Sequence, residues 1–92
     1  MSIFVLTQQS DSGPSGTLTE GILASSIQNY PLGNGAWLLA GAGTAKEICE
    51  RLGIDKGLYG TGILTEVSSY YGRANPAIWS WIKQNWEERA VG

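Results

Sequence analysis

The chain contains no histidine and only one cysteine, and these two absences remove most familiar catalytic arrangements. Without histidine, neither a Ser-His-Asp triad nor an imidazole base can be assembled from this chain. A single cysteine cannot form an internal disulfide, which is typical of proteins in a reducing cytoplasm. We therefore expect a cytoplasmic protein that has no catalytic residue set, no metal site and no cofactor.

Charge is also scarce, because only 6 basic and 8 acidic residues occur among 92, for a net charge of −2. Proteins that bind nucleic acid usually concentrate basic residues on one surface to neutralise phosphates. The basic residues here are dispersed: Lys46, Arg51, Lys56, Arg73, Lys83 and Arg89. We therefore expect contact with nucleic acid only as part of a complex. The apolar run near the start is four residues long, which indicates neither a signal peptide nor a membrane span.

The first third of the chain predicts a strand followed by a helix. Residues Ile3–Leu6 form a short apolar run with β-favouring members, which is typical of a central strand. Residues 8–16 are rich in Ser, Gly and Pro and predict a loop. Thr17 and Glu20 have the spacing of a capping box and mark a helix start. We expect the Asn and Pro within residues 29–31 to end this helix.

The middle of the chain predicts a hairpin and a second helix. A short edge strand leads to a turn at Gly33–Gly35, and a strand follows over Ala36–Ala40. Thr44 and Glu47 repeat the capping-box spacing, and Gly53 suits the end of the helix. The apolar stripe of this helix comprises Ala45, Ile48, Cys49 and Leu52. Such i, i+3, i+4, i+7 spacing predicts one buried face.

The last third predicts a strand and a C-terminal helix rich in aromatic residues. Residues Ile63–Ser68 alternate as a half-buried strand does. Asn75 and Pro76 suit the cap and the first position of a helix over residues 75–89. Its apolar arc comprises Ile78, Trp79, Ile82 and Trp86. We expect Trp79 and Trp86 in the core or in a dimer seam, whereas Trp81 lies about 100° from the centre of the arc.

This order of elements predicts an α+β fold in a single domain over residues 1–92. Right-handed crossovers and short connections arrange β-α-β-β-α-β as a ferredoxin-like plait. Its antiparallel sheet has strand order 4-1-3-2, both crossover helices lie on one face, and the C-terminal helix is an addition.

The run from Trp37 to Trp86 resembles a family of small ferredoxin-like proteins of bacteria and phages. The resemblance lies in the Trp-Leu-Leu strand, the segment TAKEICERL and the segment YYGRANPAIWSWIKQNW. These proteins are akin to the CRISPR adaptation nuclease and to its RNA-cleaving antitoxin relative. The resemblance implies a ferredoxin-like fold, dimers formed through the sheet, and a phage or mobile-element origin.

The nucleases of that superfamily place an acidic metal ligand near the end of the first strand. In this chain that strand ends Leu6-Thr7-Gln8-Gln9, and the nearest acid is Asp11. Glu66 is the other candidate carboxylate, and it falls several residues along the fourth strand from Asp11, too far to share one metal ion. A metal-dependent endoribonuclease that uses Asp11 is therefore the alternative hypothesis and not the leading one.

Two further features have ordinary structural interpretations. The segment GAGTAKE of residues 41–47 matches neither the P-loop pattern nor the dinucleotide-binding pattern, so it predicts a turn into a capped helix. Cys49 lies on the apolar stripe, where an isolated cysteine packs as a small hydrophobic residue.

The aromatic residues near the C-terminus are the best candidates for recognition. Tyr, Trp and Arg are the residue types most enriched at binding hot spots. The predicted binding residues are Tyr70, Tyr71, Arg73 and Trp81, and the sequence leaves open whether Trp81 belongs to an interface or to the core. The leading hypothesis is a non-catalytic protein-binding module, such as an anti-CRISPR inhibitor of a host defence complex, that forms a homodimer. A regulator or antitoxin that binds RNA or a toxin is a further alternative.

Overall fold

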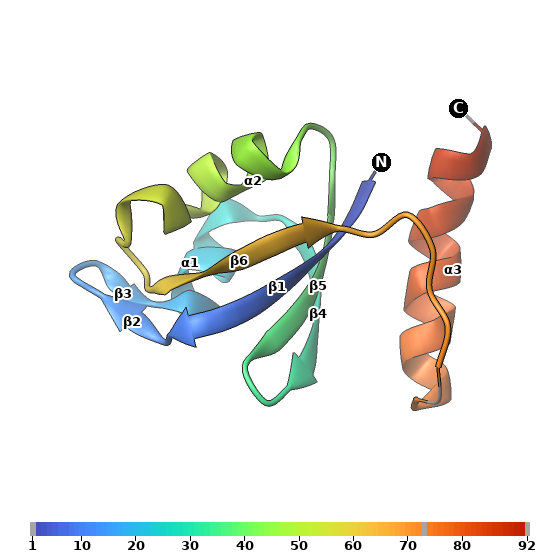
Figure 1. The fold of residues 1–92 in the computed structure, drawn as a ribbon, viewed down its shortest axis with the longest axis horizontal. Helices are drawn as coiled ribbons and strands as arrows, with labels where there is room; N and C mark the ends of the chain where they lie inside the picture. Colours follow the sequence, from blue (N-terminus) through green and yellow to red (C-terminus); the bar gives the residue numbers. More distant parts are fainter. Residues whose placement is uncertain (1, 73, 92) are drawn as a thin grey trace.

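A four-stranded antiparallel sheet organises the protein (Figure 1). The computed structural model describes residues 2–72 and 74–91, with side chains described through residue 85. The sheet contains β4 (Gln28–Gly33), β5 (Ala36–Gly41), β1 (Ser2–Ser10) and β6 (Thr61–Glu66), in that spatial order. Together with three α-helices this makes the described part of the chain an α+β structure, as predicted.

The strand order β4-β5-β1-β6 differs from the predicted 4-1-3-2 when the strands are numbered along the chain. The difference arises from a short hairpin, β2 (Ser12–Gly13) and β3 (Gly16–Thr17), which sequence analysis assigned to a loop. When only the four strands of this sheet are numbered along the chain, their spatial order is 2-3-1-4. The first strand, β1, therefore pairs with both β5 and β6.

The missed hairpin is held by the segment that precedes β6. The backbone N–H of Ser15, in its turn, donates to the carbonyl oxygen of Leu58 at 2.7 Å. Gly13 faces the carbonyl oxygens of Gly57 and Leu58 so closely that a Cβ would clash with them. The hairpin depends on this contact with a distant segment, and local composition therefore indicated only a loop.

Both crossover helices begin where the capping boxes predict. They are α1 (Leu18–Ser25) and α2 (Ala45–Leu52). At the start of α2, the N–H of Glu47 donates to the Thr44 hydroxyl at 3.2 Å, and the N–H of Thr44 donates to the Glu47 carboxylate at 2.9 Å. Thr17 and Glu20 make the same reciprocal pair in α1. Gly53 ends α2 with a φ of 74°, as a C-cap glycine does.

The predicted end of the first helix is wrong. The helix ends at Ser25, and Ser26 adopts the left-handed conformation with a φ of 59°. Asn29 and Pro31, which we expected to stop the helix, lie within β4. Proline is accommodated there because β4 is an edge strand. The predicted turn between β4 and β5 is confirmed, since Asn34 and Gly35 both have positive φ.

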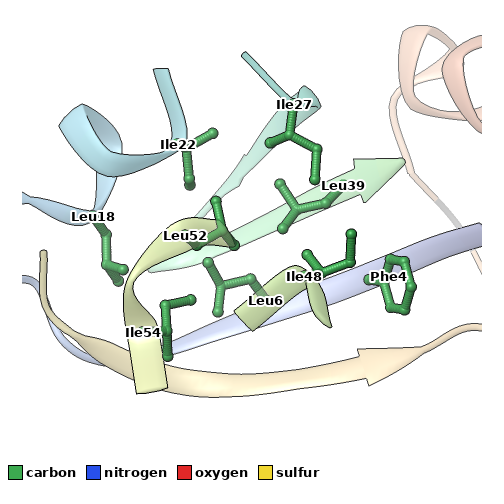
Figure 2. Close-up of a cluster of buried hydrophobic side chains, with 9 residues drawn as sticks. All are labelled: Phe4, Leu6, Leu18, Ile22, Ile27, Leu39, Ile48, Leu52 and Ile54. Carbon is green, nitrogen blue, oxygen red and sulfur yellow. The ribbon is translucent and has the colours of Figure 1, made fainter. Parts of the chain in front are cut away.

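The main hydrophobic core fills the space between the sheet and the pair α1 and α2 (Figure 2). It also includes Ile54 of the short 3₁₀ helix η1 (Ile54–Lys56). The remaining buried members are Phe4, Leu6, Leu18, Ile22, Ile27, Leu39, Ile48 and Leu52. Ile48 and Leu52 thus face the sheet as predicted. Gly21 is needed in α1 because the ring of Tyr59 lies where a Cβ would be.

A smaller cluster lies on the opposite face of the sheet under α3 (Pro76–Val91). Its buried members are Ile3, Leu38 and Ile82. Half-buried side chains surround them: Val5, Tyr30, Val67, Ile78, Trp79 and Trp81. The predicted core position of Trp86 lies outside the described side chains. Within the described residues, no helix has both the length and the apolar character needed to cross a membrane.

Candidate functional site

Exposed aromatic rings gather where the segment after β6 meets α3. Tyr71 is 102% exposed and Tyr70 is 41% exposed, although both are large rings. The Tyr70 ring stacks on Trp79, with centroids 5.8 Å apart and an interplanar angle of 24°. Together with Gly72 these residues line a depression of about 220 Å³. We call Tyr70, Tyr71, Gly72 and Trp79 the aromatic surface.

Local structure at both ends of the segment positions this aromatic surface. The N–H of Val67 donates to the carbonyl oxygen of Ile3 at 2.8 Å, so the chain leaves the sheet beside β1. Asn75 caps α3, because its side-chain oxygen accepts from the N–H of Ala77 at 2.9 Å. The predicted start of α3 at Asn75 and Pro76 is therefore confirmed. Trp79 follows within the first turn and meets Tyr70.

The structure separates Trp81 from the two tyrosines with which it was grouped in the predicted binding set. Trp79 and Trp81 differ by about 200° around the helix. The Trp81 ring meets Tyr30 of β4 at a centroid distance of 6.3 Å and an angle of 57°. Trp81 is half-buried, at the boundary between core and surface. Arg73, the remaining predicted binding residue, lies outside the described residues.

Trp81 instead borders a polar groove between α3 and the start of β4. The groove has a volume of about 260 Å³, and besides Trp81 four carboxamide residues line it: Gln28, Asn29, Gln84 and Asn85. We call these five residues the amide groove. Asn29 pairs with Leu39 of the main core, so its side chain lies on the face of α1 and α2, and it lines the groove from the edge of the strand. No charged side chain is among the five residues, so the groove suits an uncharged polar group.

Hydrogen bonds to the backbone orient two of the four carboxamides. The Asn29 Nδ2 donates to the carbonyl oxygen of Ile27 at 3.0 Å. The Asn85 Nδ2 donates to the carbonyl oxygen of Trp81 at 2.9 Å, and Asn85 is only 6% exposed. Each bond uses the amide nitrogen, and no described residue donates to the Oδ1 of Asn85. The groove therefore contains one oriented side-chain acceptor, Asn85 Oδ1, beside an indole ring.

The carboxylates that sequence analysis weighed stand at opposite ends of β6. Ser10 pairs with Thr61 at the start of β6, and Asp11 follows Ser10. Glu66 pairs with Phe4 at the other end of the strand, about 17 Å away by strand rise. Among the described residues, no group of three or more histidine, cysteine or acidic side chains is placed to hold a metal ion.

Cys49 and the N-terminus of α2 have the structural roles expected from the sequence. Cys49 packs half-buried against the main core. Burial raises the pKa of its thiol, and the nearby Asp55 and Glu50 carboxylates raise it further, so the reactive thiolate is disfavoured. At the start of α2, hydrogen bonds from the backbone and side chain of Thr44 lower the pKa of Glu47. The Glu47 carboxylate therefore occupies the position that an anion would take.

Sequence reasoning missed the carboxamide residues and the role of Trp79 at the surface. One signal was present, because Asn85 lies seven residues after Ile78, which places it about 20° from Ile78 at the edge of the apolar arc, on the side of Trp81. A polar residue at that position indicates that the apolar face gives way to a polar site. Gln28 and Asn29 carried no such signal, since they were assigned to the end of a helix. Comparisons with protein-family models, curated proteins and solved structures found no match.

Proposed function

We propose that this protein is a non-catalytic binding module that recognises a protein partner through the aromatic surface. The observation that carries the proposal is the full exposure of Tyr71 beside the stacked rings of Tyr70 and Trp79. Burial of one such ring removes about 150–250 Å² from water and fixes few rotamers. Exposure therefore leaves a large free energy of association available to a partner.

Charge favours a protein partner over a nucleic acid. Aromatic rings also stack on bases, but proteins that use them so combine the rings with a positively charged groove. The net charge here is −2, and the basic residues are dispersed along the sequence. Nucleic acid is accordingly proposed as a component of the partner complex and not as an independent ligand.

Host defence complexes, including CRISPR effectors, are the first partners to test. This choice rests on the sequence resemblance to small bacterial and phage proteins, which stays a prediction together with the phage or mobile-element origin. Inhibition of such a complex by direct contact is the concrete form of the function that we propose. The endoribonuclease that would use Asp11 and the RNA-binding or toxin-binding regulator have no further observation in their favour.

The test compares Tyr71→Ala with Leu23→Ala. Leu23 is an exposed apolar residue on α1, remote from the aromatic surface, so it controls for loss of exposed apolar area. Immobilised wild type and both variants are incubated with lysate of the source organism, and bound proteins are quantified by mass spectrometry. We expect a partner that Leu23→Ala retains and Tyr71→Ala loses, with affinity reduced by at least ~2 kcal/mol in the purified pair. Equal capture by all three proteins would show that the aromatic surface is not the binding site.

We further propose a homodimer formed along β6. The support is that β6 is an edge strand, that residues 61–65 include neither charge nor proline, and that Ile63 is 67% exposed beside this edge. Edge strands that must stay unpaired usually carry charged residues or proline. Sedimentation over a range of concentrations should show a dimer for the wild type and a monomer for Ile63→Lys. A monomeric wild type would contradict the proposal.

The ferredoxin-like plait and the cytoplasmic location are part of the same proposal. The position of β1 between β5 and β6, with α1 and α2 over one face, supports the plait. The unpaired thiol of Cys49 supports a reducing compartment.

A further inference from the structure

The outer edge of β4 exposes the backbone of one residue in particular. The N–H of Gln8 donates to the carbonyl oxygen of Gly35 at 2.7 Å. Every second residue after Gly35, namely Trp37, Leu39 and Gly41 of β5, therefore directs its backbone groups toward β1. The pairing of β1 with β5 is regular, and the residues of β5 that remain for β4 are Ala36, Leu38 and Ala40. Of these, Leu38 pairs with Tyr30 and Ala40 pairs with Gln28. The residue between them, Asn29, therefore directs its N–H and C=O away from the sheet.

The positions on either side of Asn29 offer less to a partner strand. Ile27 has the same outward direction, but its N–H donates to the Ser25 hydroxyl and its carbonyl oxygen accepts from Asn29 Nδ2. Pro31 has no N–H, and the register shifts between Pro31 and Gly33. The open part of the edge thus comprises the N–H and C=O of Asn29 and the C=O of Pro31. Such an edge accommodates a short segment and not a long added strand.

The amide groove begins at this open edge, because Asn29 belongs to both. Its volume of about 260 Å³ lies below the ~300–1,000 Å³ typical of sites that enclose a small molecule. A carboxamide also has the same donor and acceptor groups as a peptide unit. The groove therefore matches one polar side chain, or a peptide unit, of a segment that passes along the edge.

We propose that β4 binds an extended, uncharged polypeptide segment of a partner, which pairs with Asn29 and places one polar side chain in the amide groove. The partner residue opposite Asn29 exchanges two backbone hydrogen bonds with it. The oriented Oδ1 of Asn85 accepts from the inserted side chain, and the indole of Trp81 forms a wall. This mode of recognition obtains affinity from the main chain and specificity from the pocket. It rests on the proposed function, since it specifies how a protein partner is bound.

The decisive comparison is Asn29→Pro with Asn29→Ala. Proline removes only the outward N–H from the backbone, so the pairing of β4 with β5 stays intact, and the preceding residue is already extended. Alanine removes the same side chain but keeps the N–H. The difference between the two variants therefore isolates the backbone bond to the partner segment.

The probe is an array of acetylated and amidated hexapeptides, in which the central residue is Asn, Gln, Ser, Thr, Lys or Glu and the others are uncharged. We expect binding of members with an uncharged polar centre. With the best hexapeptide, ¹⁵N NMR should show shift changes at residues 28–30 and 81–85 of the wild type. Asn29→Pro should weaken binding about tenfold, and Asn29→Ala should weaken it much less, because alanine keeps the outward N–H. Gln84→Lys, which leaves the strand unaltered, should weaken it and favour a Glu centre.

Four results would overturn the proposal: no hexapeptide bound at millimolar concentration, shifts confined to the aromatic surface, equal affinity of Asn29→Pro and wild type, or a second copy of the chain already paired along residues 28–30. If Asn29→Pro does not fold, unchanged binding of the hexapeptide by Gln84→Lys would also overturn the proposal. A protein partner whose capture depends on Tyr71 would leave the proposed function standing in each of these cases.

Discussion

The two faces of the sheet differ in the kind of side chain that packs on them and in how many of these side chains are buried. On the face covered by α1 and α2, nine hydrophobic residues are buried, all of them aliphatic except Phe4. On the face covered by α3, three of the described side chains are buried, and half-buried aromatic rings surround them. Both candidate sites lie beside α3: the aromatic surface includes Trp79, and the amide groove includes Trp81. We therefore expect the first face to provide most of the stability, and the second face presents the groups that we propose for binding.

The helix ends show the same contrast. The helices of the first face both begin with complete capping boxes. Among the described residues, the N-terminal amides of α3 donate one side-chain hydrogen bond, from the N–H of Ala77 to Asn75 Oδ1. Because each satisfied terminal amide stabilises a helix, we expect α3 to open more readily than the rest.

The largest expected effect is the loss of a side chain from the first face. Leu52→Ala should lower the free energy of unfolding by roughly 2–5 kcal/mol, because Leu52 is enclosed on all sides. Ile82→Ala should lower the free energy of unfolding by about 2 kcal/mol, because α3 can move toward the sheet and reduce the cavity. Urea denaturation of both variants measures the difference. A larger loss for Ile82→Ala would reverse the comparison of the two faces.

A smaller effect is expected at the capping boxes. Thr44→Ala should cost about 1 kcal/mol of global stability, since the N–H of Glu47 loses its acceptor. Asn75→Ala should loosen α3 with less effect on the global free energy, because the main core does not depend on that helix. Denaturant melts that give equal losses for the two variants would mean that α3 unfolds together with the core.

The smallest effect is the pH dependence contributed by Glu47. Its pKa is lower in the folded protein than in the unfolded chain, so its stabilisation is present above the ordinary pKa of a glutamate. This stabilisation is lost as the pH falls through the lowered value. We therefore expect the stability of Glu47→Gln to depend less on pH below that ordinary value. Urea midpoints at a series of acidic pH values check this, and an unchanged slope would contradict the assignment.

Features fixed by neighbouring residues were predictable from the sequence. The capping boxes, the C-cap at Gly53 and the Asn34-Gly35 turn each depend on a few adjacent positions, and all were found as expected. The hairpin β2–β3 and the polar second half of β1 depend on backbone pairing with distant segments. Hydrophobic periodicity does not detect such pairing, and the first residues of β4, Gln28 and Asn29, were assigned to the end of the preceding helix.

The same distinction applies to the candidate sites. Exposure of Tyr70 and Tyr71 followed from their position in a connection between elements. The separation of Trp81 from them did not, because it depends on which side of α3 meets Tyr30. The amide groove combines the start of β4 with the middle of α3, and no local pattern relates these two segments.

Native-state hydrogen exchange tests the contrast between the two faces most directly. The amides of β1, β5 and α2 should exchange only through global unfolding, because the main core must open to expose them. The amides of α3 should exchange through a separate opening whose free energy is lower by ~2 kcal/mol or more. If the amides of α3 reach the same free energy as those of β1, both faces belong to one cooperative unit, and the division into a stabilising face and a binding face is wrong.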